Sequence, residues 1–157
     1  MTLASVPKHL VALELLDRSI ELYLRGDSFY AALHLGGAAE ELLAVYARAI
    51  PIASTMTLAP AFDQMKEAIV SFISPQSPAE KVAAEKWAHD RLNGAKNSVK
   101  HKRGPKDDSV DFDAKEEAYD VIDRAITTYF QLLSVLRLPH LPSVQVFDAR
   151  RRSESNE

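Results

Sequence analysis

Apolar residues recur along most of this chain at intervals of three and four positions, the spacing of one face of an α-helix. The pattern predicts helices over residues 6–25, 28–50, 60–73, 77–101 and 113–138. Glycine and proline separate these segments, since Gly26, Pro51 and the Gly104-Pro105 pair fall at helix ends. No segment shows the alternation of a β-strand. The sequence therefore predicts an all-α fold, an antiparallel bundle of about five helices.

Polar residues at the starts of these helices support the boundaries. Ser77 and Glu80 flank Pro78 as a capping box that opens the fourth helix, and Asp113 with Glu116 opens the fifth in the same way. Asp27 is the expected cap of the second helix. We expect a single domain over residues 1–147 and a disordered tail over 148–157, where few apolar residues remain.

The fourth helix combines an apolar stripe with a polar cluster near its end. The stripe, at helical spacing, consists of Ala84, Ala88, Leu92, Ala95 and Val99. Asn97 and His101, four residues apart, point away from that stripe and should face solvent, a ligand or another chain. An ordinary explanation stays open, because the polar face of an amphipathic helix is solvated and cations are favoured in a last helical turn.

The charge of the chain narrows its possible partners. The net charge of the 157 residues is -3, which argues against a general nucleic-acid coat. A local basic segment nevertheless stands out, because five cations fall within eleven residues: Lys96, Lys100, Lys102, Arg103 and Lys106. The absence of cysteine excludes thiolate metal sites and cysteine nucleophiles. With no signal peptide and no long apolar run, we expect a cytoplasmic protein without membrane contact.

Metal chemistry has weak support in the sequence. Glu14 with Asp17 and Glu117 with Asp120 form carboxylate pairs at helical spacing that could hold magnesium in an all-helical nucleotide pyrophosphatase. Solvated acidic helix faces explain the same pairs. Because no Glu-x-x-His motif is present, the sequence predicts neither a metal site nor a cofactor.

One segment is similar to a known family. The run Lys96-Asn97-Ser98-Val99-Lys100-His101 resembles the motif of HEPN domains, which is an arginine, a polar residue, a few variable residues and a histidine near the end of a late helix. Residues 91–95 also resemble bacterial members of that group. The second helix, from Tyr30 through Leu43, is similar to the long helical hairpin of the family. The resemblance covers roughly residues 6–138.

The resemblance implies an all-helical dimer with a composite cleft in which active members cleave RNA without metal. His101 would take the histidine position, Asn97 the polar position and Lys96 the arginine position. A lysine keeps the charge but loses the planar fork that holds a phosphate through two hydrogen bonds. Further contacts to RNA or phosphate are expected from Asn93, Lys100, Lys102 and Arg103.

Two functions remain in competition. The first is an HEPN-like RNA- or nucleotide-binding protein, or a metal-independent ribonuclease, of a toxin–antitoxin or defence system with an antitoxin-type protein partner. The second is a non-enzymatic helical module for dimerisation or protein interaction. A homodimer is expected because the first helix is apolar on two sides and Gly36-Gly37 interrupts the second helix. Close approach of another helix's backbone is the preferred reason for these glycines, and a kink is the alternative.

Overall fold

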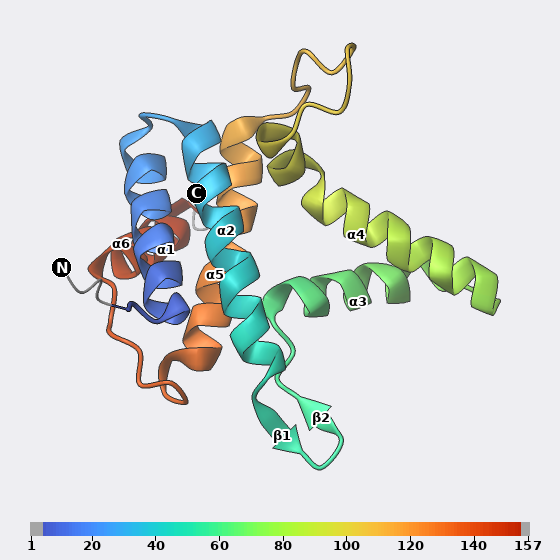
Figure 1. Cartoon of the computed structure of the whole chain (residues 1–157), viewed down its shortest axis with the longest axis horizontal. Helices are drawn as coiled ribbons and strands as arrows, with labels where there is room; N and C mark the ends of the chain where they lie inside the picture. The colour runs from blue at the N-terminus through green and yellow to red at the C-terminus, as the bar shows by residue number, and fades with distance from the viewer. Residues whose placement is uncertain (1–4, 155–157) are drawn as a thin grey trace.

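A computed structural model describes residues 5–154 of the chain. Within that range the chain forms six helices and one two-stranded antiparallel hairpin, which confirms the prediction of an all-α fold (Figure 1). The elements are α1 (Lys8–Arg25), α2 (Phe29–Arg48), β1 (Pro51–Ala53), β2 (Met56–Thr57), α3 (Ala61–Ile73), α4 (Pro78–Lys100), α5 (Ala114–Leu133) and α6 (Pro142–Glu154).

Helix α2 lies between α1 and α5 and shares the main hydrophobic core with both (Figure 1). A Cβ atom on Gly36 would lie 2.8 Å from the Ser19 Oγ of α1. That hydroxyl donates a 2.7 Å hydrogen bond to the carbonyl of Ala32, which links α1 to α2 one turn before Gly36. The glycine pair thus does not serve a close backbone approach, because the atoms nearest to the two absent Cβ positions are side-chain atoms of α1, α4 and α5 in the same chain. The glycines no longer argue for a second subunit.

Helix α3 and the first half of α4 pack against each other and project from the bundle as an arm (Figure 1). The start of α4 follows its predicted cap, because Ser77 Oγ accepts the backbone N–H of Glu80 at 3.2 Å. The Glu80 carboxylate accepts the N–H of Gln76, one residue before the cap. The second half of α4 returns to α2 and α5, which brings the predicted site residues against the main core.

Four local predictions are wrong. The fifth helix, expected to reach 138, ends at Leu133. Ser28, rather than Asp27, caps α2 by accepting the N–H of Ala31. The β1–β2 hairpin was not expected, because its strands are exposed on both faces and carry no alternating pattern. The expected disordered tail is helical from 148 to 154, while residues 155–157 lie outside the described range. Helix α6 is held to the bundle by a few apolar contacts, because Phe147 is buried against the ring of Tyr23.

No helix in the described part of the chain has the length and apolar character needed to cross a membrane.

Candidate functional site

The second half of α4 carries all the site residues predicted from the sequence except those in the loop that follows it. The structure divides them among three environments. Lys96 belongs to a buried ionic network in the wall of a cleft between α2, α3 and α4, Asn93 and Asn97 line the same cleft, and the rest lie at the end of α4.

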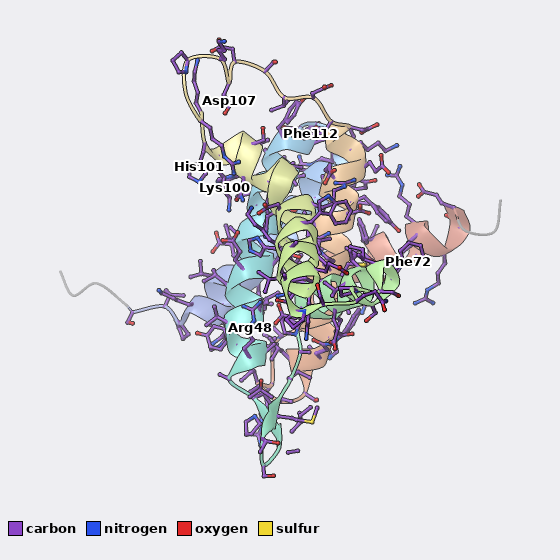
Figure 2. The ribbon with its side chains drawn as sticks, turned by 90° about the vertical axis from the view of Figure 1, so that its right-hand side faces the viewer. Arg48, Phe72, Lys100, His101, Asp107 and Phe112 are labelled. Carbon is purple, nitrogen blue, oxygen red and sulfur yellow. The ribbon has the colours of Figure 1, made fainter. Side chains whose placement is uncertain are left out.

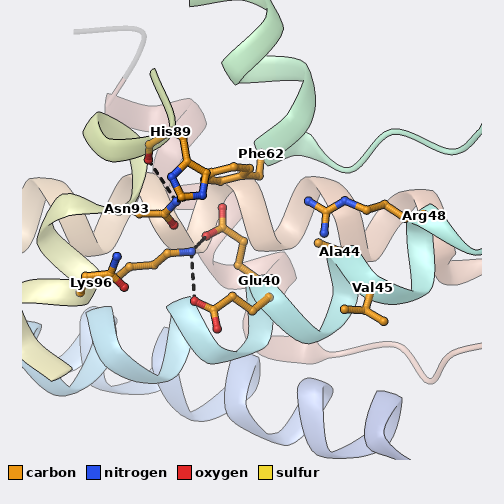
Figure 3. Close-up of a pocket in the computed structure, with 10 residues that line it drawn as sticks. Glu40, Ala44, Val45, Arg48, Phe62, His89, Asn93 and Lys96 are labelled. Atoms are coloured by element: carbon orange, nitrogen blue, oxygen red, sulfur yellow. Dashed lines mark hydrogen bonds and ion pairs between the residues drawn. The ribbon is translucent and has the colours of Figure 1, made fainter. Parts of the chain in front are cut away.

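The buried network is centred on Glu40 of α2. Its two carboxylate oxygens accept hydrogen bonds from Lys96 Nζ at 2.9 Å and from Arg124 Nε of α5 at 2.6 Å. The side chains of Glu40 and Lys96 are each only 2% exposed. Figure 3 shows the Lys96 ammonium group between two carboxylates, and the Phe62 ring centroid lies 5.3 Å away from it. Glu41 adds a second carboxylate 3.4 Å from Lys96 Nζ, so two negative charges lie against the two cations, as burial of charge requires.

Lys96 is therefore a structural residue in this chain. A Cβ atom on Gly37 would lie 3.1 Å from Lys96 Cδ, so the second glycine of α2 makes room for the lysine stem. The expectation that the Lys96 ammonium group would meet RNA is not supported, because that group is enclosed by Glu40, Glu41 and Phe62. The position to which the resemblance would assign a phosphate-binding arginine thus holds a lysine of α4 whose ion pairs are with Glu40 and Glu41 of α2.

The cleft beside this network has a volume of about 380 Å³. Asn93 is buried in its wall, where its amide nitrogen donates to the backbone oxygen of His89 at 3.0 Å and lies 3.1 Å from the His89 ring nitrogen Nε2. Asn97 also lines the cleft and has no side-chain hydrogen bond within the described chain. Asn93 thus has local partners, whereas the Asn97 amide is available to a ligand.

Two ion pairs form the rim of the cleft. Burial disfavours ionisation of Glu41, but Lys96 and Lys100 outweigh that effect and hold the pKa of Glu41 below its ordinary value. The Asp63 carboxylate accepts two hydrogen bonds from the Arg48 guanidinium, at 2.8 and 2.7 Å, and these bonds lower the pKa of Asp63. The rim is thus built from compensated charges.

The end of α4 carries the remaining residues, of which His101, Lys102 and Arg103 are exposed, while Lys100 is partly buried and pairs with Glu41 at 3.3 Å. The helix stops at Lys100, and His101 follows with an extended backbone (φ -136°, ψ 131°) and an exposed side chain. In Figure 2 the two side chains lie next to each other below the loop that carries Asp107. His101 lines a hollow of about 510 Å³, formed with the loop and with Tyr30 of α2. The outward direction predicted for this histidine is confirmed.

Acidic residues of the loop lie close to the exposed cations. Lys102 forms an ion pair with Asp108, and the backbone N–H of Arg103 donates to the Asp107 carboxylate at 2.6 Å. The Arg103 side chain is exposed. A polyanion that approaches this end of α4 would compete with carboxylates that already occupy part of its basic surface.

Sequence reasoning missed Glu40 and Phe62, which contact Lys96, and Arg124, which binds the other oxygen of Glu40. One signal was available, because Glu40 interrupts the apolar side of α2 and a carboxylate there needs cationic partners once it is buried. Another signal was the position of Lys96, four residues after Leu92 and three before Val99. That spacing places Lys96 beside the apolar stripe rather than opposite to it.

The carboxylate pairs considered for magnesium are used in other contacts. Asp17 accepts a hydrogen bond from Ser143, and Glu117 pairs with Arg91. Burial raises the pKa of Asp120. Across residues 5–154, no three histidine, aspartate or glutamate side chains are grouped closely enough to hold a metal ion. The nucleotide pyrophosphatase alternative gains no support from this arrangement.

Comparisons of the chain with models of known families, with curated proteins and with solved structures gave no match.

Proposed function

We propose that the chain is an HEPN-like RNA-binding protein that holds the phosphate backbone of a single strand at the end of α4. The observation that carries the proposal is the placement of exposed His101 in an open hollow beside Lys100 and Lys102. Cations so arranged attract phosphates without reading the bases. The hollow supplies Tyr30, which is about half exposed, as an aromatic surface for a nucleobase.

Binding has better support than cleavage. Metal-free cleavage needs a group that takes the 2′-hydroxyl proton and a cation beside the strained phosphate. His101 is accessible for proton transfer, but Lys96, the motif cation, is enclosed by its ionic partners. Cleavage is therefore the second candidate, and it requires another cation or a second chain to complete the site. A toxin role with an antitoxin-type partner would follow only from cleavage.

The test is RNA affinity measured over a range of salt concentrations. The variant Lys102→Gln/Arg103→Gln should bind a fluorescent single-stranded RNA more weakly and with a flatter salt dependence. The logarithmic slope should fall by about 0.7 for each phosphate that the protein no longer neutralises. The matched control is Lys8→Gln/Lys81→Gln, which removes two exposed positive charges far from the hollow. Equal reductions in RNA affinity and in salt dependence for the two variants would contradict a localised binding site.

The same assay separates binding from cleavage. His101→Ala should leave thermal stability nearly unchanged, because the side chain is exposed. If the parent cleaves the RNA, this variant should bind it without cleaving it. If the parent only binds, no shortened product should appear in either sample.

A further inference from the structure

The arm formed by α3 and the first half of α4 has very little core of its own. Ala61 and Phe62 are buried at the start of α3, where the Ala61 N–H donates to Thr128 of α5. Beyond them, the arm's own cluster of buried apolar residues is Val70, Ala84 and Ala88, with Ile69 packed against it. This small cluster is separate from the main core shared by α1, α2 and α5. Helical hairpins derive most of their stability from packing of an apolar face, so a hairpin with so small a core needs a further surface to cover it.

One face of the arm is apolar and open. Phe72 is 91% exposed and Trp87 is 56% exposed. Between them lies a hollow of about 450 Å³ whose lining contains no charged residue: Ala68, Ile69, Phe72, Ile73 and Trp87. Met65 extends the same stripe of α3, since it lies four positions before Ile69 and is about half exposed.

The area of this face is close to what a specific interface needs. Four large side chains of this face are exposed: Met65, Phe72, Ile73 and Trp87. Together they present on the order of 500 Å² of apolar surface, given the usual size of such residues. That is near the upper end of the apolar patches found on monomers. Two copies facing each other would bury about 1,000 Å², the lower limit for a specific interface. Polar residues at the edge would add to that figure.

The charges around the face favour a second copy as its occupant. Lys66 and Glu67 of α3, and Glu85 and Lys86 of α4, place both signs along the arm. In a two-fold interface residue i of one copy contacts residue j of the other, and residue j contacts residue i in return, so a face that carries both signs can complement itself. A membrane surface or a nucleic acid would instead favour a cationic rim.

We propose that two copies of this chain associate through their α3–α4 arms, with Phe72 and Trp87 at the centre of the interface. Two helical hairpins that face each other across a two-fold axis form a four-helix bundle, in which each hairpin supplies half of the core. The interface joins the small core of Val70, Ala84 and Ala88 to its symmetry copy. The arm projects because its partner surface lies on the other chain.

This dimer is distinct from the composite cleft that the HEPN resemblance implies. His101 lies fourteen residues beyond Trp87, which is about 20 Å along the axis of α4. Association through the arms leaves each His101 in its own hollow, away from the two-fold axis. A variant can therefore lose RNA binding without losing dimerisation through the arms, and the reverse.

The test is the mass of the protein in solution, measured by analytical ultracentrifugation. The parent should sediment at about twice its chain mass of 17.4 kDa. Phe72→Ser should shift it to monomer, or weaken association at least tenfold, without loss of helicity, because the side chain is almost fully exposed. Phe130→Ser is the matched control, since Phe130 is an exposed phenylalanine on α5, and it should leave the dimer intact.

A distance measurement identifies the interface itself. The chain has no cysteine, so one introduced cysteine per chain carries one spin label. Labels at Glu85→Cys on the arm should lie closer together in the dimer than labels at Lys106→Cys in the loop after α4. A monomeric parent, a dimer that resists Phe72→Ser, or a shorter distance at position 106 would each overturn the proposal.

Discussion

Replacing Glu40 by glutamine tests whether the buried network holds α4 against the bundle. Glu40→Gln keeps the shape of the side chain but removes the negative charge that Lys96 and Arg124 share. Lys96 would retain only the half-exposed Glu41, at 3.4 Å. Arg124 would retain the carbonyl of Leu92, also at 3.4 Å. The substitution therefore leaves two buried cations poorly compensated.

The expected cost follows from that change. Removing one partner of a buried ion pair costs about 3–5 kcal/mol, because the remaining charge stays out of water. The remaining contacts of Lys96 and Arg124 are long, so we expect Glu40→Gln to lower the free energy of unfolding by about 3 kcal/mol or more. The lysine also anchors the second half of α4 over Gly37, so that segment should loosen first.

Urea unfolding followed by circular dichroism measures this difference. Glu41→Gln is the matched control, because it removes a neighbouring carboxylate that is more than half exposed and should cost less than about 1 kcal/mol. A decrease below about 1 kcal/mol for Glu40→Gln, or equal decreases for both variants, would refute the reasoning.

Three further predictions concern packing, pH and the loop. In urea unfolding, Gly36→Ala should destabilise the protein by about 1–3 kcal/mol, because the new Cβ would lie 2.8 Å from the Ser19 hydroxyl. Gly94→Ala should instead stabilise it by up to about 1 kcal/mol, since a Cβ there meets nothing within 4 Å. Because the pKa of Asp63 is lowered, its pairing with Arg48 stabilises the fold above about pH 5, and this stabilisation is lost on acidification. The difference in unfolding free energy between the parent and Asp63→Asn should therefore shrink as the pH falls. Amide exchange of residues 102–111 should be fast, because few apolar contacts hold them; slow exchange throughout would show a packed loop.

The helical architecture could be predicted because it depends on local patterns. The periodic apolar positions and the caps at Ser77 and Asp113 act within a few residues, and the structure places α4 and α5 close to the predicted starts. Helix α6 was not predicted, because its stability comes from contacts of Val144 and Phe147 with distant parts of the chain. Such contacts leave no local signal.

The candidate site could be predicted only in part. The exposure of His101 agrees with the prediction, but the reason differs, because α4 ends at Lys100 and His101 follows with an extended backbone. The environment of Lys96 depends on Glu40, 56 residues earlier, and on Arg124, on a third helix. A pattern along α4 cannot reveal which of its cations will find a buried partner. The residue type at the motif position was visible, but its structural role was not.

The most direct test of the proposed function is a map of the RNA contacts on the folded protein. Backbone amide signals should be followed by NMR as a short single-stranded RNA is added. We predict saturable shifts concentrated at residues 98–103 and in the loop up to 110, with the His101 ring signals moving over the same concentration range. Signals of Glu40 and of the α3–α4 arm should stay in place. Saturation at another surface, or no saturable shift, would contradict the proposal that the end of α4 binds RNA.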